Sequence, residues 1–197
     1  MRHDLDTIYL SDDFTGRKWT TYHEYCCVVD ELFNPASFLD LGCAQGFTVD
    51  YFARSTLAVG IEGASAPFSL ATQLACQCMQ VHDLRDPLDL GRQFDLVNCT
   101  EVMEHLEPEY EPVLLDTITR HMSHYLIFTA ASVYDKAKGT PRQSHWNVQP
   151  YKHWELALQD RGLVLNTVMR DRMRVMLKEK KNVYPWWGRD LIVCQTS

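Results

Sequence analysis

The sequence lacks the features of secreted and membrane-spanning proteins. No apolar run approaches the roughly 20 residues that a membrane-spanning helix needs, and residues 1–6 lack the apolar centre of a signal peptide. The 7 cysteines form no C-x-x-C pair and lie mostly in apolar runs, which predicts reduced core residues. These absences predict a cytoplasmic protein with no membrane span.

Positive charge is also scarce relative to negative charge. The chain has 19 Lys and Arg against 26 Asp and Glu, for a formal net charge of −7. A surface of this charge does not attract polyanions, so nucleic acid would have to bind a local basic patch. Segment 170–189 offers such a patch, with 7 basic residues against 2 acidic ones.

The stretch 37–47 is the most informative part of the sequence. An apolar run that carries Asp40 ends at Gly42, and Gly46 lets the chain enter a helix, as after the first strand of a parallel sheet. The stretch has neither the G-x-G-x-x-G dinucleotide fingerprint nor the Gly-Lys-Ser/Thr of a phosphate loop. We therefore expect a ligand other than a pyrophosphate at this turn, where a bare backbone can approach it closely and free amides can receive a carboxylate.

Apolar periodicity predicts further strands and helices along the chain. The expected strands after the turn are 57–63, 78–84, 94–100, 125–130, 163–169 and 190–194; the expected helices are 22–33, 48–53, 65–75, 112–122 and 151–160. Glu62 ends a strand about 20 residues after the glycine turn, where a carboxylate can accept both hydroxyls of a ribose. Asp83 closes the next strand in the same way.

These features together resemble the class I methyltransferases that depend on S-adenosylmethionine (SAM). Asp40, Gly42 and Gly46 match the family's first motif, and Ala44 replaces the more usual middle glycine. Glu62 matches the second motif, and the strand that ends in Thr100 and Glu101 resembles the fourth. The resemblance implies an α/β fold: a Rossmann-like, doubly wound, mostly parallel seven-stranded sheet, whose last strand is antiparallel beside the sixth.

The resemblance also implies that SAM is the cosubstrate. It assigns the ribose to Glu62 and the adenine amino group to Asp83. The residues that it places around SAM are Asp40, Gly42, Cys43, Ala44, Gln45, Gly46, Phe47, Glu62, Gly63, Asp83, Leu84, Thr100 and Glu101.

The acceptor has to be inferred from the loops. Segments 144–154 and 186–191 look like those of bacterial and phage methyltransferases associated with sugar or surface-polysaccharide metabolism, and their aromatic and amide side chains suit a sugar. We expect O-methylation of a small-molecule or glycan-like acceptor, with His145 as the general base and His105 as the second candidate. The whole chain, 1–197, is expected to form one domain. In it, 1–35 is an N-terminal helical cover, while 132–150 and 170–189 are loops on the acceptor side.

Two alternatives remain open. If the segment after the fourth strand is helical, Glu101, Glu104 and His105 share one face, and His145 could be a fourth ligand to a divalent metal. This set resembles metal-dependent enzymes that 2′-O-methylate the 3′ ends of small RNAs. However, Glu-x-x-Glu-His also occurs in metal-free methyltransferases, so no metal is assigned. The second alternative is a SAM-binding scaffold without catalysis, against which the presence of all the cofactor acids argues.

Overall fold

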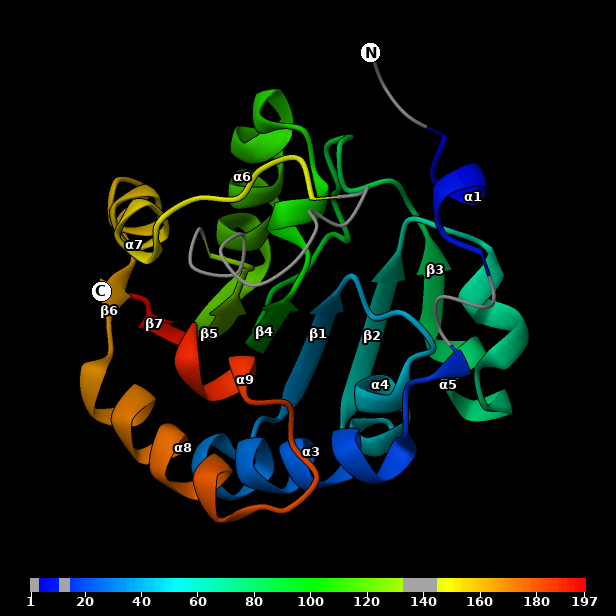
Figure 1. The fold of residues 1–197 in the computed structure, drawn as a ribbon, viewed down its shortest axis with the longest axis horizontal. Coiled ribbons are helices and arrows are strands. Elements are labelled where there is room, and N and C mark those ends of the chain that lie inside the picture. Colours follow the sequence, from blue (N-terminus) through cyan, green and yellow to red (C-terminus); the bar gives the residue numbers. More distant parts are fainter. Residues whose placement is uncertain (1–3, 11–14, 133–144) are drawn as a thin grey trace.

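The computed structural model describes residues 4–10, 15–132 and 145–197. In these ranges seven strands form one sheet in the order β3-β2-β1-β4-β5-β7-β6 (Figure 1). The strands are β1 (Ser37–Leu41), β2 (Leu57–Glu62), β3 (Met79–Val81), β4 (Phe94–Thr100), β5 (Met122–Thr129), β6 (Val164–Leu165) and β7 (Ile192–Gln195).

The strand pairing confirms the predicted doubly wound topology. β1 pairs in parallel with β2 on one side and with β4 on the other, so the strand order reverses between β1 and β4. β7 lies between β5 and β6 and is antiparallel to both, as predicted for the last strand. Open parallel sheets bind ligands at the carboxyl ends of the strands, next to such a reversal. The glycine turn follows β1 and therefore lies at this position.

Helices cover both faces of the sheet. They are α1 (Leu5–Ile8), α3 (Trp19–Phe33), α4 (Phe47–Phe52), α5 (Gln73–Cys78), α6 (Glu111–His121), α7 (Tyr151–Gln159), α8 (Thr167–Glu179) and α9 (Trp186–Arg189), with 3₁₀ turns η1 (Ala66–Leu70), η2 (Met103–His105) and η3 (Pro108–Tyr110). Among the described residues, no helix has both the length and the apolar character that crossing a membrane requires.

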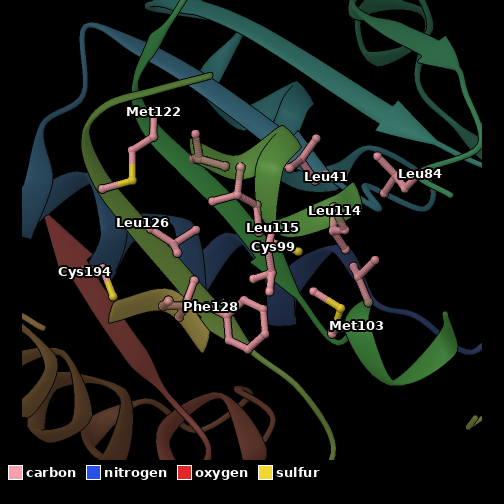
Figure 2. Close-up of a cluster of buried hydrophobic side chains, with 14 of the residues drawn as sticks. Leu41, Leu84, Cys99, Met103, Leu114, Leu115, Met122, Leu126, Phe128 and Cys194 are labelled. Carbon is pink, nitrogen blue, oxygen red and sulfur yellow. The ribbon is translucent and has the colours of Figure 1, made fainter. Parts of the chain in front are cut away.

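Alternate residues of the strands enter two different hydrophobic cores, one on each face of the sheet. On β5, Leu126 and Phe128 belong to the first core and Ile127 to the second. Helices α6 and α7 cover the first core, and α3, α4 and α8 cover the second (Figure 1). Figure 2 shows Leu114 and Leu115 of α6 in the first core together with Leu126 and Phe128. This burial on both faces explains why the strands are apolar almost throughout.

Two predicted elements between β2 and β4 are shorter than expected. The single helix predicted over 65–75 is two pieces, η1 and α5, because Ala71 is extended with ψ 154°. Thr72 then starts α5, since its side chain accepts the N–H of Ala75 at 3.1 Å. The third strand ends at Val81, so Asp83 lies in the loop beyond it.

The predicted sixth strand, 163–169, is wrong in its second half. β6 ends at Leu165, and the side chain of Asn166 accepts the N–H of Met169 at 2.9 Å, which caps the start of α8. Most of the basic segment that was predicted to be a loop is therefore helical. Met173 and Leu177 on α8 are buried in the second core, so this helix is part of the body of the protein.

Candidate functional site

The glycine turn between β1 and α4 is held by short backbone hydrogen bonds. The N–H groups of Gly42 and Cys43 both donate to the carbonyl of Ile61, at 2.8 and 3.0 Å. Gly42 and Gly46 have φ values of +77° and +71°, which favour glycine. A Cβ at Gly42 would also meet Val102 at 2.3 Å, so a side chain there would displace the segment that follows β4.

Glu62 at the end of β2 is tied to this turn. Its Oε2 accepts the N–H of Ala44 at 2.8 Å, and its Oε1 accepts the N–H of Ala64 at 3.0 Å. Burial raises the pKa of Glu62, and hydrogen bonds from the backbone N–H groups of Ala64, Ala44 and Gly63 oppose this rise. A carboxylate can accept about four hydrogen bonds, so beside these three Glu62 keeps capacity for a ribose hydroxyl.

Asp40 lies in a buried hydrogen-bonded network next to the turn. Its Oδ1 accepts from the side-chain amide of Asn98 at 2.7 Å, and its Oδ2 accepts from the hydroxyl of Thr48. The hydroxyl of Tyr25 donates to Asn98 Oδ1 at 2.7 Å, which joins α3 to the network. Burial raises the pKa of Asp40 to about 6, against the lowering effect of the Thr48 and Asn98 hydrogen bonds. Asp40 therefore supports the turn by linking β1, β4 and α4.

The turn also contains an unsatisfied polar atom. Gln45 is 5% exposed, and in the described part of the chain its Oε1 has no hydrogen-bond partner. A buried carbonyl oxygen is normally paired with a hydrogen-bond donor, which water or a ligand can supply. SAM carries an ammonium group and two ribose hydroxyls, so the free acceptor capacity of Gln45 and Glu62 fits it. These features are the observations in this structure that agree with the predicted SAM site.

Asp83, predicted to contact adenine, is held by a buried arginine that the sequence analysis did not single out. Arg85 Nε donates to Asp83 Oδ1 at 3.0 Å, and Arg85 Nη2 donates to Oδ2 at 2.8 Å. Arg85 is 5% exposed and also pairs with Glu107 at 3.3 Å. Leu84, between them in sequence, is buried in the first core. The contact of Asp83 with adenine stays a prediction, and the two-residue spacing to Arg85 was the available signal for this pair.

The segment after β4 is not the helix that the metal alternative assumed. Glu101 has φ 58°, a left-handed conformation, so a helical turn begins only at η2. The N–H of Glu101 donates to the carbonyl of Thr129 at 3.0 Å, and Glu101 Oε1 accepts the Thr129 hydroxyl at 2.8 Å. Glu101 and Glu104 are therefore not placed by one continuous helix. Thr100 is the last residue of β4, so its cofactor role and that of Glu101 remain predictions.

An aromatic cluster next to the turn was not recognised in the sequence. The ring of Phe47 lies 5.7 Å from that of Trp19 and 5.2 Å from that of Tyr22, between centroids. Tyr22 in turn contacts Trp187 at 5.3 Å and Tyr184 at 6.2 Å. The three-residue spacing of Trp19 and Tyr22 on α3 was a signal, but nothing local predicts their contact with residues more than 100 positions away.

His105 and His145, the two predicted catalytic residues, lie together. Their ring centroids are 4.6 Å apart and their planes are perpendicular. Glu104 joins them, because one potential ligand atom from each of the three residues lies within 4.8 Å of the others. Burial raises the pKa of Glu104 well above its usual range, and the negative charge of Glu101 adds to this effect. Of the predicted loop 132–150, residues 133–144 lie outside the described residues.

Comparison with known families now identifies the class of protein. Residues 16–179 match the sequence model of a methyltransferase domain, which covers most of the chain. The chain belongs to this methyltransferase family, in the class I group that uses SAM as cosubstrate. Among curated proteins, none matches the sequence.

Solved structures with the same fold include several methyltransferases. Magnesium protoporphyrin IX methyltransferase from Synechocystis PCC 6803, with bound S-adenosylhomocysteine (SAH), is 16% identical with TM-score 0.61 over 90% of this chain and 82% of that one. The plantazolicin methyltransferase BpumL, in complex with a pentazolic desmethylplantazolicin analogue and SAH, is 12% identical with TM-score 0.63 over 95% and 90%. A SAM-dependent methyltransferase from Clostridium acetobutylicum ATCC 824 is 12% identical with TM-score 0.62 over 78% and 84%.

Proposed function

We propose that this methyltransferase transfers the SAM methyl group to an oxygen of a small-molecule or glycan-like acceptor. The observation that carries the proposal is the aromatic cluster of Trp19, Tyr22, Phe47, Tyr184 and Trp187 beside the cofactor turn. Aromatic rings offer flat apolar surfaces that suit a sugar ring or another compact organic acceptor. The sulfonium is a strong leaving group, so the protein mainly has to align the acceptor and exclude water.

RNA is the second candidate acceptor. The basic segment 170–189, which favoured RNA in the sequence, is less available in the structure. The basic residues of segment 170–189 are partly occupied by contacts within the chain. Arg174 donates to the carbonyls of Gly188 and Leu191, at 2.8 and 3.2 Å, and Arg170 pairs with Asp171 at 2.9 Å. The grouping of Glu104 with two histidines is the observation that favours the metal-dependent alternative. A protein surface that binds RNA irrespective of its base sequence needs accessible basic side chains that contact the phosphates. The net charge of −7 also opposes binding to a polyanion.

His145 is proposed as the general base, with His105 second. His145 follows the fifth strand in the chain and lies against His105, next to the segment that contacts Gly42 through Val102. An imidazole with an ordinary pKa near 6.5 can accept a hydroxyl proton at neutral pH, which typically contributes about 10²–10⁴-fold in rate. We expect His145→Ala to lose turnover by a factor in this range and to lose the acidic limb of the pH profile.

The acceptor class can be tested with SAM labelled in its methyl group. The acceptor panel contains nucleotide sugars, simple glycosides and short single-stranded RNA with either a 2′-hydroxyl or a 2′-deoxy 3′ end. Label transferred to a sugar-containing or other small acceptor supports the proposal. Label transferred to RNA only when the terminal 2′-hydroxyl is present, with stimulation by Mn²⁺, would replace it by the second candidate.

The base assignment needs a matched control. His124 is an exposed histidine near the start of β5, at the opposite end of that strand from the site. His145→Ala and His145→Gln should both lower kcat and flatten its pH dependence, while His124→Ala should change neither. Wild-type turnover and pH dependence in both His145 variants would refute the base role, and a loss of acceptor affinity alone would leave His145 as a positioning residue.

A further inference from the structure

The chain on the C-terminal side of His145 is attached to the body of the protein by backbone hydrogen bonds. The N–H groups of Trp146 and Asn147 both donate to the carbonyl of Glu104, at 2.8 and 3.1 Å. Asn147 is 0% exposed, so its side-chain amide has to find its hydrogen-bond partners within the protein. The partners of this amide therefore determine how the segment next to His145 is held.

The side chain of Asn147 is bound at both of its polar atoms. Its Nδ2 donates to Glu111 Oε2 at 3.0 Å, and its Oδ1 accepts from the side-chain amide of Gln149 at 2.8 Å. An ionised carboxylate can only accept hydrogen bonds, so the amide nitrogen has to face Glu111 and the amide oxygen has to face Gln149. The charge of Glu111 thus sets the orientation of the buried amide.

Glu111 connects three parts of the chain through one carboxylate. It is the first residue of α6, and the N-terminal end of a helix stabilises negative charge. While Oε2 accepts from Asn147, Oε1 accepts from Nε2 of His153 on α7 at 2.9 Å. The side chain of Glu111 is 16% exposed, so these hydrogen bonds are partly shielded from water. Glu111 therefore joins α6, α7 and the segment that follows His145.

We propose that Asn147 and Glu111 are positioning residues for His145. The ring of His145 lies 4.6 Å from that of His105 between centroids, with the planes perpendicular. Asn147 is only two residues from His145 and is fixed through both its backbone and its side chain, so a displaced amide would also displace the imidazole. A misplacement of about 1 Å can lower a rate by about 10²-fold, even when the altered residue is far from the reacting atoms.

The proposal rests on the proposed function only in that it takes His145 as the general base. The placement of the imidazole can be observed without turnover, by nuclear magnetic resonance of the histidine ring C–H groups, with the signal assigned through His145→Gln. The neighbouring ring of His105 should shift the His145 signal by its ring current, and displacement should change this shift. The exposed His124, which pairs with Asp95, is an internal reference whose signal should stay constant.

An exchange of donor and acceptor between positions 111 and 147 tests the proposal. Asn147→Asp places a second carboxylate against Glu111, and at alkaline pH the two negative charges repel each other. Adding Glu111→Gln supplies an amide N–H that can donate to the new carboxylate, while the bonds to Gln149 and His153 keep their polarity. At this pH, Asn147→Asp alone should lower kcat by about 10²-fold and alter the His145 signal. The double variant should restore both.

Glu111→Ala and Glu109→Ala complete the set of variants. Glu111→Ala removes the same acceptor without adding a charge, so it tests the placement of His145 even if Asn147→Asp is unstable. Glu109 is an exposed acid on η3, just before α6, and its substitution should change neither kcat nor the His145 signal. Circular dichroism should show that the variants stay folded, and calorimetry should show that they bind SAM with the affinity of the wild type.

The outcomes separate the positioning role from the base role. An unchanged His145 signal in folded Asn147→Asp and Glu111→Ala would overturn the proposal, and so would a double variant that recovers neither kcat nor the signal. Wild-type turnover in His145→Gln would refute the base role instead, and the resonance signals would still decide whether Asn147 and Glu111 position the imidazole.

Discussion

The contact of Glu62 with the SAM ribose is the most direct test of the cosubstrate site. Glu62 already accepts the N–H groups of Ala44 and Ala64, so its substitution removes these bonds as well as any bond to the ribose. A hydrogen bond to a charged group contributes about 1.5–3 kcal/mol. Losing the ribose contact in Glu62→Ala should therefore weaken SAM binding by about 10- to 150-fold.

Calorimetric titration of SAM and SAH measures this loss. Both ligands carry the same ribose, so both affinities should fall by a similar factor. Glu31→Ala removes an exposed carboxylate from α3 and should leave both affinities unchanged. Because Glu62→Ala also removes two hydrogen bonds from the turn, the unfolding midpoint of each variant has to be measured beside its affinity.

A 2′-deoxy analogue of SAH separates the two effects of Glu62. If Glu62 accepts the 2′-hydroxyl, deleting that hydroxyl should weaken binding to the wild type but hardly change binding to Glu62→Ala, as in a double-mutant cycle. If Glu62 acts only by holding the turn, removing the 2′-hydroxyl should reduce the binding free energy by the same amount in the wild type and in Glu62→Ala. Equal losses in the cycle would refute the ribose contact even where Glu62→Ala binds SAM poorly.

Three further predictions concern the turn and the network beside it. In the folded chain the Asp40 pKa is raised from 3.8 to about 6, so this group favours folding at low pH and loses that effect as the pH rises through about 6. Relative to the non-titrating Asp40→Asn, the unfolding free energy of the wild type in urea should fall by about 3 kcal/mol from a pH well below 3.8 to a pH well above 6, and a constant difference would contradict the shift. Ala44→Gly should raise the free energy of unfolding by up to about 1.5 kcal/mol, because Ala44 has φ 50° and glycine adopts this conformation without strain. The greater entropy of glycine in the unfolded chain reduces this gain, and a clear loss of stability in the same assay would contradict the strain. Tyr25→Phe should lower the free energy of unfolding by about 1–2 kcal/mol in the same assay, since it leaves Asn98 Oδ1 without its buried donor. An unchanged free energy of unfolding would show that this hydrogen bond contributes little.

The sheet was predictable because its signals are local. The strands are short apolar runs separated by helical periodicity, and Gly42 and Gly46 mark the turn by their own backbone requirements. The errors arose where a short apolar run fits either a strand or a helix. The apolar run 163–169 was predicted as one strand, but the strand has only two residues, because Asn166 caps the start of α8. An Asn before a helical pattern is a known signal for a helix start and could have been used here.

The site was only partly predictable because its groups come from distant segments. The residues of the turn and Glu62 are fixed by their positions at strand ends, and the structure places them together. The pairing of Asp83 with Arg85 and the aromatic cluster depend on tertiary contacts that no sequence period encodes. The two histidines lie side by side, and their catalytic role stays a prediction. The helical face considered for Glu101 is absent because its backbone is left-handed.

The first described segment contacts both ends of the site. A Cβ on Gly63 would meet the side chain of Leu5 at 2.6 Å, and the backbone N–H of Ser65 donates to Asp6 at 2.6 Å. A few residues later, the ring of Tyr9 lies 5.6 Å from that of His105. Residues 5–9 thus lie against the predicted ribose side through Gly63 and against the predicted catalytic residue His105. Because a few consecutive residues contact both parts, the placement of this segment links the predicted cosubstrate site to the predicted catalytic histidines.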